Sequence, residues 1–287
     1  MTIQEIRTGF LKKEFSALEL VEHHMARIRE KDRELHAFLN VTEKLAIAEA
    51  LEIDEKIARK EELPPLAGVP CSVKDAILVE GIACTAGSRI LENYIAPYDA
   101  TVVKKIKEAG ALIMGKTNMD EFGMGSSTEN SAFGPTKNPK DLTRVAGGSS
   151  GGSAASVAAG ECVVSLGEDT GGSIRLPASF CGVVGLKPTY GAVSRYGIIA
   201  VASSLDQVGP MAGTVEDAEI LFNIIKGKDV MDATSVELRN SVPKHLGTKF
   251  LSNLRIGVPK EYFGQGLDPQ VEKVVRDSIE KLENAGA

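Results

Sequence analysis

Hydrophobic residues near the start of the chain recur at helical spacing. Leu18, Val21, Met25 and Ile28 follow one another at steps of three and four residues, so they share one face of a helix. The segment Ser16–Glu19 is a capping box, in which the serine oxygen and the glutamate carboxylate satisfy free amides at a helix start. This pattern predicts an amphipathic helix that begins just after Ser16.

A second helix is predicted between Thr42 and Ile57, with a charged face toward solvent. Pro64 and Pro65 then interrupt the pattern. We therefore interpret residues 1–65 as a helical N-terminal portion.

The hydrophobic pattern changes after residue 65, where short apolar runs alternate with glycine-rich turns and helical segments. The runs are VPCSVKDAILV (69–79), DATVVKKIKEAG (99–110) and ALIMGKT (111–117). Such alternation is typical of an α/β layer structure with a largely buried sheet. We interpret residues 66–287 as this α/β core.

Toward the C-terminus the pattern predicts two further helices and one strand. One helix begins at Thr214–Asp217, residues 226–253 form a polar loop or linker, 254–258 form a strand, and 269–284 form a helix. A strand followed by a helix normally leads to another strand of the sheet, whereas this sequence ends at Ala287. We therefore expect a C-terminally truncated chain that lacks part of its sheet.

Composition narrows the class of protein. The 287 residues are 43% hydrophobic and 25% charged, as in ordinary globular domains. The net charge of −6 argues against a broad phosphate-binding surface, which would need a basic face. No apolar run reaches the ~18–20 residues that span a bilayer, and the first residues lack the apolar core of a signal peptide. We therefore expect no membrane partner.

The cysteines and histidines predict neither a metal site nor a disulfide framework. They show no CxxC pairing and no i, i+4 histidine spacing, so a reducing cytoplasmic location is expected. These residues are Cys71, Cys84, Cys162, Cys181, His23, His24, His36 and His245.

Two segments match well-known functional motifs, but their residue types do not favour the corresponding function. Residues 110–117 satisfy the Walker A pattern, but Ala, Leu, Ile and Met inside the would-be phosphate loop favour a buried strand. Residues 147–152 match GxSxG at Ser149 and at Ser150, but a nucleophile elbow follows an apolar strand, and the preceding segment is polar.

Candidate chemistry lies in two clusters rich in glycine and serine, together with one lysine. The clusters are residues 147–160 and 166–180, and Lys74 lies inside an apolar run. Burial lowers the pKa of a lysine, so a buried amine can accept the proton that a serine must lose to become a nucleophile. The plainer alternatives are glycine-rich turns and an ion pair between Lys74 and Asp75.

Lys74, GGSSGGSAA (147–155) and DTGGSIRLPAS (169–179) together resemble the amidase signature family, serine hydrolases with a Ser–cisSer–Lys triad. The resemblance implies an amidase-signature fold, with a mixed sheet covered by helices on both faces. It implies that Ser173 is the nucleophile and Lys74 the general base. Ser149 would be the bridging serine, joined to Ser150 through a cis peptide, and would pass the proton between them.

The same resemblance implies roles for neighbouring groups. Backbone amides would form the oxyanion hole, those of Thr170, Gly171, Gly172 and Ser173. Asp169 and Arg175 would pair to hold this loop. Met124 and Ser126 would lie near the substrate amide.

Three segments are similar to one branch of the family, the A subunits of aspartyl/glutamyl-tRNA amidotransferases. They are residues 115–139, 185–191 and 203–210. The similarity implies that glutamine is hydrolysed and that its ammonia passes to a partner subunit, which amidates mischarged Glu-tRNA(Gln) or Asp-tRNA(Asn). It implies B and C subunits as partners and tRNA contact through the complex. No cofactor is expected in this chain, and ATP and magnesium are expected in the partner.

Some positions depart from the family pattern. Ala76, Ala146 and Glu168 stand where Asn, Pro and a small hydroxyl residue are usual. The family's C-terminal portion, with the residues that hold the glutamine α-amino and α-carboxylate groups, is also absent. Two alternatives therefore stay open: a stand-alone amidase acting on other amides, and a catalytically silent fragment that only folds or binds a partner subunit.

Overall fold

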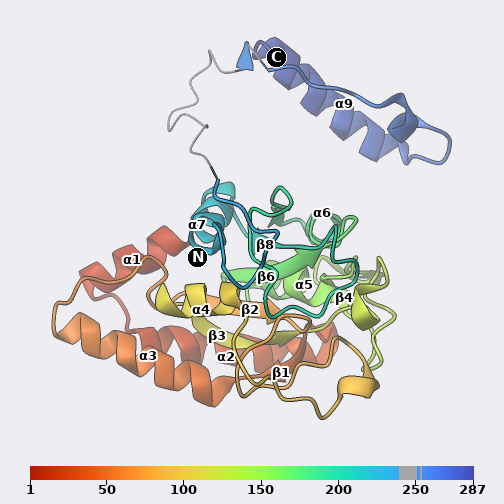
Figure 1. Cartoon of the computed structure of the whole chain (residues 1–287). Coiled ribbons are helices and arrows are strands. Elements are labelled where there is room, and N and C mark those ends of the chain that lie inside the picture. The colour runs from red at the N-terminus through yellow and green to blue at the C-terminus, as the bar shows by residue number, and fades with distance from the viewer. Residues whose placement is uncertain (239–250, 253) are drawn as a thin grey trace. The chain divides into compact units, whose positions relative to one another are not determined.

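A computed structural model describes residues 1–238, 251–252 and 254–287, in two compact units, Met1–Leu238 and Arg239–Ala287 (Figure 1). The boundary predicted near residue 65 lies inside the first unit and stays a prediction. Part of the linker predicted over 226–253 lies outside the described residues.

The first unit is built on a six-stranded mixed sheet with the strand order β1-β3-β2-β6-β8-β7. β2 runs parallel to β3 and to β6, and the other neighbours are antiparallel. A separate ribbon pairs β4 with β5. The strands are β1 Phe38–Val41, β2 Pro70–Lys74, β3 Leu112–Thr117, β4 Lys137–Asn138, β5 Asp141–Val145, β6 Val164–Asp169, β7 Val184–Gly185 and β8 Gln207–Ala212. The predicted α/β class is confirmed.

Helices cover both faces of this sheet (Figure 1). In the first unit they are α1 Ile3–Lys12, α2 Ala17–Leu35, α3 Glu43–Ala58, α4 Thr101–Glu108, α5 Gly151–Ala158, α6 Arg175–Cys181 and α7 Val215–Ile225, with short 3₁₀ turns at Arg89–Leu91 and Glu121–Gly123. The predicted capping box at Ser16 is present, and Thr214 caps α7 as expected. Local capping chemistry was therefore sufficient to locate these helix starts.

β1 interrupts the region that was predicted to be helical throughout. Phe38–Val41 pairs antiparallel with β3, a strand more than 70 positions further along the chain. Its four residues carry no strand periodicity of their own. A partner that is distant in sequence decides their conformation, and local patterning does not reveal it.

The second unit contains the predicted helix, α9 Pro269–Asn284, capped by Asp268. A 3₁₀ turn at Lys260–Phe263 precedes it. The strand predicted over 254–258 was wrong, because these residues pair with no other strand in the described part of this unit. An extended segment becomes a strand only where a neighbouring backbone completes its hydrogen bonds.

The parallel strands bring three chain segments to one edge of the sheet. Lys74 ends β2, Thr117 ends β3 and Asp169 ends β6. The carboxyl ends of parallel strands lie on the same side, where α/β proteins commonly hold their ligands. The residues singled out in the sequence converge at this edge.

Candidate active site

Lys74 is the centre of the site. Its side chain is fully buried, at 0% exposure. Its amine Nζ lies 2.8 Å from Ser149 Oγ and 3.2 Å from the backbone oxygen of Glu168, and 3.7 Å from the Glu168 carboxylate. The Lys74 amine thus contacts Ser149, in the first glycine-serine cluster, and Glu168, in β6, which leads to the loop of the second cluster.

Burial governs the protonation of this site. Removal from water lowers the pKa of Lys74, because the ammonium loses its hydration, and the negative charge of Glu168 opposes this shift. Burial likewise raises the pKa of the Glu168 carboxyl, opposed by the positive charge of Lys74. A lysine in this environment is able to act as a base, as its sequence context predicted.

Asp75 does not pair with Lys74, so the alternative ion pair was wrong. Its carboxylate lies 2.9 Å from Lys116 Nζ, and both side chains are buried. The same carboxylate accepts hydrogen bonds from the amide and hydroxyl of Thr85. Because Lys116 neutralises Asp75, the amine of Lys74 remains free to contact Ser149.

Substituting Lys116 by methionine is expected to lower the free energy of unfolding by about 3–5 kcal/mol, since the buried Asp75 carboxylate would lose its cation. Urea unfolding measures this change. Lys107→Met is the control: Lys107 pairs with Asp99 where both side chains are partly exposed, and its loss should cost no more than about 1 kcal/mol. Equal losses in the two variants would contradict the buried-pair argument.

Ser149 lies where the first glycine-serine cluster enters α5. A cis peptide bond is present, but it joins Gly148 to Ser149, so the prediction of a cis bond between Ser149 and Ser150 was wrong. Position 148 is closely surrounded, because a Cβ there would lie 2.2 Å from a carboxylate oxygen of Asp120. Only glycine fits before Ser149, a constraint from residues that are distant in the sequence.

Ser173 lies in the loop between β6 and α6, nearly buried at 9% exposure. Its backbone oxygen accepts a hydrogen bond of 3.1 Å from the amide of Ser150. The Ser150 hydroxyl in turn bonds the backbone oxygen of Glu168 at 3.0 Å. The structure therefore joins the two clusters through the amide and the hydroxyl of Ser150, and within the described residues the Ser149 and Ser173 hydroxyls do not hydrogen-bond each other.

Asp169 organises the loop that contains Ser173. As the resemblance implied, it pairs with Arg175, whose Nε lies 3.1 Å from its carboxylate. The carboxylate also accepts the amides of Gly172 at 2.7 Å and Ile174 at 3.0 Å. The Gly172 N–H was predicted to donate to the oxyanion, but in the structure it donates to the Asp169 carboxylate instead.

Three other amides of the predicted oxyanion hole remain available. Within the described chain, the N–H groups of Thr170, Gly171 and Ser173 donate to no other group. The Thr170 hydroxyl donates to Asp206 at 2.6 Å, which fixes the start of the loop. These three amides are the groups of this loop that could stabilise a developing oxyanion.

Met124 and Ser126 are exposed, Met124 at 70%. They follow Gly123, where a Cβ would lie 3.7 Å from Ser149 Oγ. The segment therefore passes beside Ser149. Among the described residues, neither side chain hydrogen-bonds to Lys74, Ser149 or Ser173.

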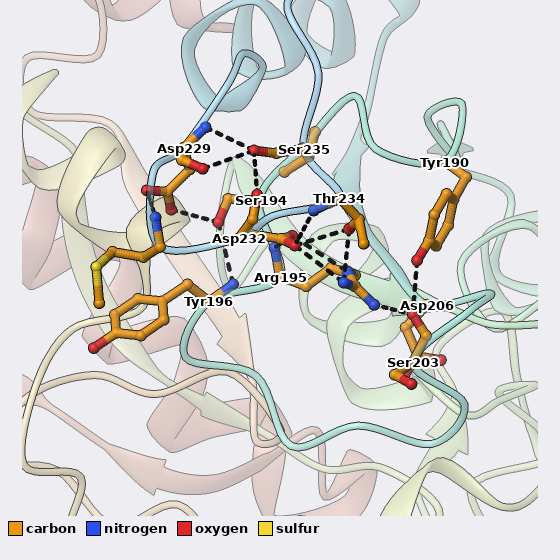
Figure 2. Close-up of polar contacts among 12 residues, drawn as sticks. Tyr190, Ser194, Arg195, Tyr196, Ser203, Asp206, Asp229, Asp232, Thr234 and Ser235 are labelled. Atoms are coloured by element: carbon orange, nitrogen blue, oxygen red, sulfur yellow. Dashed lines mark hydrogen bonds and ion pairs between the residues drawn. The ribbon is translucent and has the colours of Figure 1, made fainter.

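Figure 2 shows a polar cluster around Arg195 and Asp232, which lie 3.0 Å apart. Arg195 also donates to Thr234 and to the backbone oxygen of Ser203. A cavity of about 290 Å³ opens here, and Asp206 is among its lining residues. Because Asp206 also holds Thr170, this cavity adjoins the loop that contains Ser173.

Sequence reasoning missed three residues that shape the site. Asp120 accepts the amide of Thr128 at 2.9 Å. The Thr128 hydroxyl then donates to the backbone oxygen of Gly147. Asp206 holds Thr170, as described above. Asp120 and Asp206 could have been suspected because they lie inside 115–139 and 203–210, two of the segments that carry the family resemblance. Nothing in the local pattern revealed their partners.

Metal-binding and membrane-spanning features are absent from the described residues. Their His, Cys, Asp and Glu side chains form no group of three that could hold a metal ion. Among these same residues, every helix is too short or too polar to cross a bilayer. All four cysteines have free, buried thiols.

The fold is that of an amidase: the Amidase family profile matches residues 19–287, and the chain belongs to that family. At the level of individual relatives, it is 57% identical over its whole length to the A subunit of glutamyl-tRNA(Gln) amidotransferase from Carboxydothermus hydrogenoformans, and covers 59% of that protein. It is 55% identical to the protein of the same name from Koribacter versatilis, of which it covers 60%.

Solved structures agree with this assignment. The A subunit of glutamyl-tRNA(Gln) amidotransferase from Thermotoga maritima has a TM-score of 0.86 at 45% identity, over 100% of this chain and 60% of that one. A native peptide amidase from Stenotrophomonas maltophilia also has a TM-score of 0.86, at 32% identity, over 100% of this chain and 61% of that one. The chain thus spans about three fifths of the length of each relative.

Proposed function

We propose that this chain is a glutamine amidohydrolase that supplies ammonia for the conversion of Glu-tRNA(Gln) or Asp-tRNA(Asn) to the amidated aminoacyl-tRNA. The observation that carries the proposal is the contact of 2.8 Å between the buried amine of Lys74 and Ser149 Oγ. The names of the two relatives described above, at 57% and 55% identity, support a role in glutamyl-tRNA(Gln) amidotransfer.

The proposed chemistry combines the observed contact between Lys74 and Ser149 with the roles that the family resemblance implies for the two serines. Ser173 Oγ attacks the carboxamide carbon while its proton passes to Ser149 Oγ, whose own proton passes to the amine of Lys74. The oxyanion of the tetrahedral intermediate accepts hydrogen bonds from backbone amides of the loop. The C–N bond of the intermediate then breaks, and the leaving nitrogen takes the proton returned along the same path from Lys74 and departs as ammonia. Water hydrolyses the acyl-enzyme to glutamate and restores Ser173.

The proposed division of labour extends to the partners. B and C subunits would receive the ammonia and bind the tRNA, so that tRNA contacts this chain through the complex. ATP and magnesium would act in the partner subunit, and this chain would need no cofactor. The net charge of −6 supports this division, because tRNA binding favours a basic surface.

The test is ammonia release from glutamine, propionamide and an amidated dipeptide, measured with this chain alone and together with the B and C subunits. We expect ammonia release to be fastest from glutamine, with an excess in kcat/KM of at least about tenfold in a chain that also carries the family's C-terminal portion, because the resemblance assigns to that portion the residues that hold the α-amino and α-carboxylate groups, and a site built for them rejects substrates without them. A preference for the dipeptide would favour a stand-alone amidase, the alternative that the peptide amidase relative supports.

A further inference from the structure

The carboxyl group of Glu168 is buried beside the candidate base. The residue has 0% exposure, and in the described structure neither carboxylate oxygen has a hydrogen-bond partner. One oxygen lies 3.7 Å from Lys74 Nζ, close enough for a strong charge interaction in a dry environment. A carboxyl held in this way interacts mainly with one group, the amine of Lys74.

The other carboxylates near Lys74 are occupied. Asp120, beyond β3, accepts the amides of Thr128 and Asn130. Asp169, at the end of β6, is held by Arg175, and Asp206, before β8, by Thr170. Asp75, next to Lys74 on the chain, pairs with Lys116, as described above. Glu168 thus differs from the other acidic groups around the amine, each of which has hydrogen-bond donors of its own.

The backbone fixes Glu168 at this distance. Its carbonyl oxygen contacts Lys74 Nζ at 3.2 Å and accepts the Ser150 hydroxyl, and its amide contacts the same hydroxyl at 3.3 Å. Its position in β6 is further secured by pairing with Val208 of β8. The carboxyl is therefore held beside the amine by the sheet and by the loop that contains Ser149.

We propose that Glu168 is a positioning residue that shares a proton with Lys74 and so sets the pH range in which Lys74 can accept a proton from Ser149. This inference rests on the proposed serine hydrolase chemistry. The pair holds two, one or no acidic protons, and both groups contribute to each titration step. With two protons, Lys74 is an ammonium and cannot act as a base. With none, the amine is neutral and the carboxylate is charged.

The sign of the effect follows from Coulomb's law. The negative charge of Glu168 stabilises the Lys74 ammonium, so the amine loses its proton at a higher pH than it would beside a neutral residue. Glu168→Gln removes this stabilisation at nearly constant volume, and the desolvation of Lys74 is then less opposed. Acylation of Ser173 is therefore expected to persist to lower pH in this variant. The acid limb of its pH–rate profile, the range in which the rate falls as the pH decreases, should lie about one to three pH units lower.

The test measures the rate at which a fluorophosphonate, a general probe of activated serines, labels Ser173 across pH 5–10, with intact mass as the readout. The full chain is compared with Glu168→Gln and with Glu168→Ser. The second variant is also neutral but has a smaller side chain, so it packs differently. Both should shift the limb downward, whereas Glu168→Asp keeps the charge and should leave it within about one unit of the original.

Glu161→Gln is the matched control. Glu161 is also fully buried with both carboxylate oxygens unpartnered, but it lies ahead of the start of β6, whereas Glu168 lies near the end of that strand. Its loss should leave the pH limb unchanged. A general effect of removing a buried carboxyl would move the limb in both glutamine variants.

The outcomes separate this inference from the proposed function. An acid limb that stays in place, or moves upward, in the neutral variants at position 168 overturns the role of Glu168. The absence of labelling at every pH overturns it as well, because Lys74 would then activate no serine. If labelling behaves as expected but glutamine is not hydrolysed, the glutamine proposal fails and the role of Glu168 stands.

Discussion

Replacing Ser173 by alanine is expected to lower kcat for amide hydrolysis on the order of 10⁶-fold, because the acyl-enzyme can no longer form. Ammonia release measures the loss. Intact mass after treatment with a fluorophosphonate should increase for the unsubstituted chain and stay constant for the variant. Because Ser173 is nearly buried in a loop, the label also reports whether the probe reaches this residue.

Ser156→Ala is the control for this prediction. Ser156 is another buried serine, on α5, whose hydroxyl lies 2.9 Å from that of Ser72 and donates to the backbone oxygen of Ser153. Its replacement should retain activity and cost about 1 kcal/mol of stability. If Ser173→Ala instead left amide turnover unchanged, the chain would be the catalytically silent fragment that the sequence also allowed.

Replacing Lys74 by methionine is expected to lower the acylation rate by about 10²–10⁴-fold, the usual contribution of a general base. In the unsubstituted chain the rate should fall about tenfold per pH unit below the pKa of the base, since protonation of the amine removes its lone pair. Burial lowers that pKa, which keeps the amine neutral over a wider range, while Glu168 opposes the shift. The acid limb should be missing from the variant.

Stability must be separated from chemistry in this experiment, because Lys74→Met leaves the Glu168 carboxyl buried without its cation. The double variant Lys74→Met/Glu168→Gln removes both charges and should unfold at a higher urea concentration than the single variant, yet remain equally slow. Lys107→Met, at a partly exposed lysine, should keep both the rate and the limb. If the double variant retained the acid limb, the limb would reflect the titration of a group other than Lys74.

Local sequence determined much of the fold. The capping box at Ser16 and the cap at Thr214 located the starts of α2 and α7, because these interactions involve residues within one helical turn. The apolar run around Lys74 indicated a buried lysine, and 69–79 and 111–117 supplied the adjacent parallel strands β2 and β3. The C-terminal helix was likewise predicted with its observed bounds.

Features that depend on distant partners were predicted less well. β1 needed β3 to become a strand, and 254–258 found no partner among the described residues. The cis bond falls before Ser149, where Asp120 crowds Gly148. Asp75 pairs with Lys116 rather than with its chain neighbour Lys74.

By itself, then, the sequence determined which chemical groups this protein possesses: a lysine in an apolar strand, and two serines in glycine-rich loops. Only the tertiary structure decided which of them meet, because β2 pairs with β6 and brings Lys74 beside Glu168, while the loop before α5 places Ser149 in contact with Lys74. The physical reason is range. Helix caps and periodicity act within a few residues, whereas burial, charge pairing and the contact between base and hydroxyl depend on strands and loops that are joined only when the sheet forms.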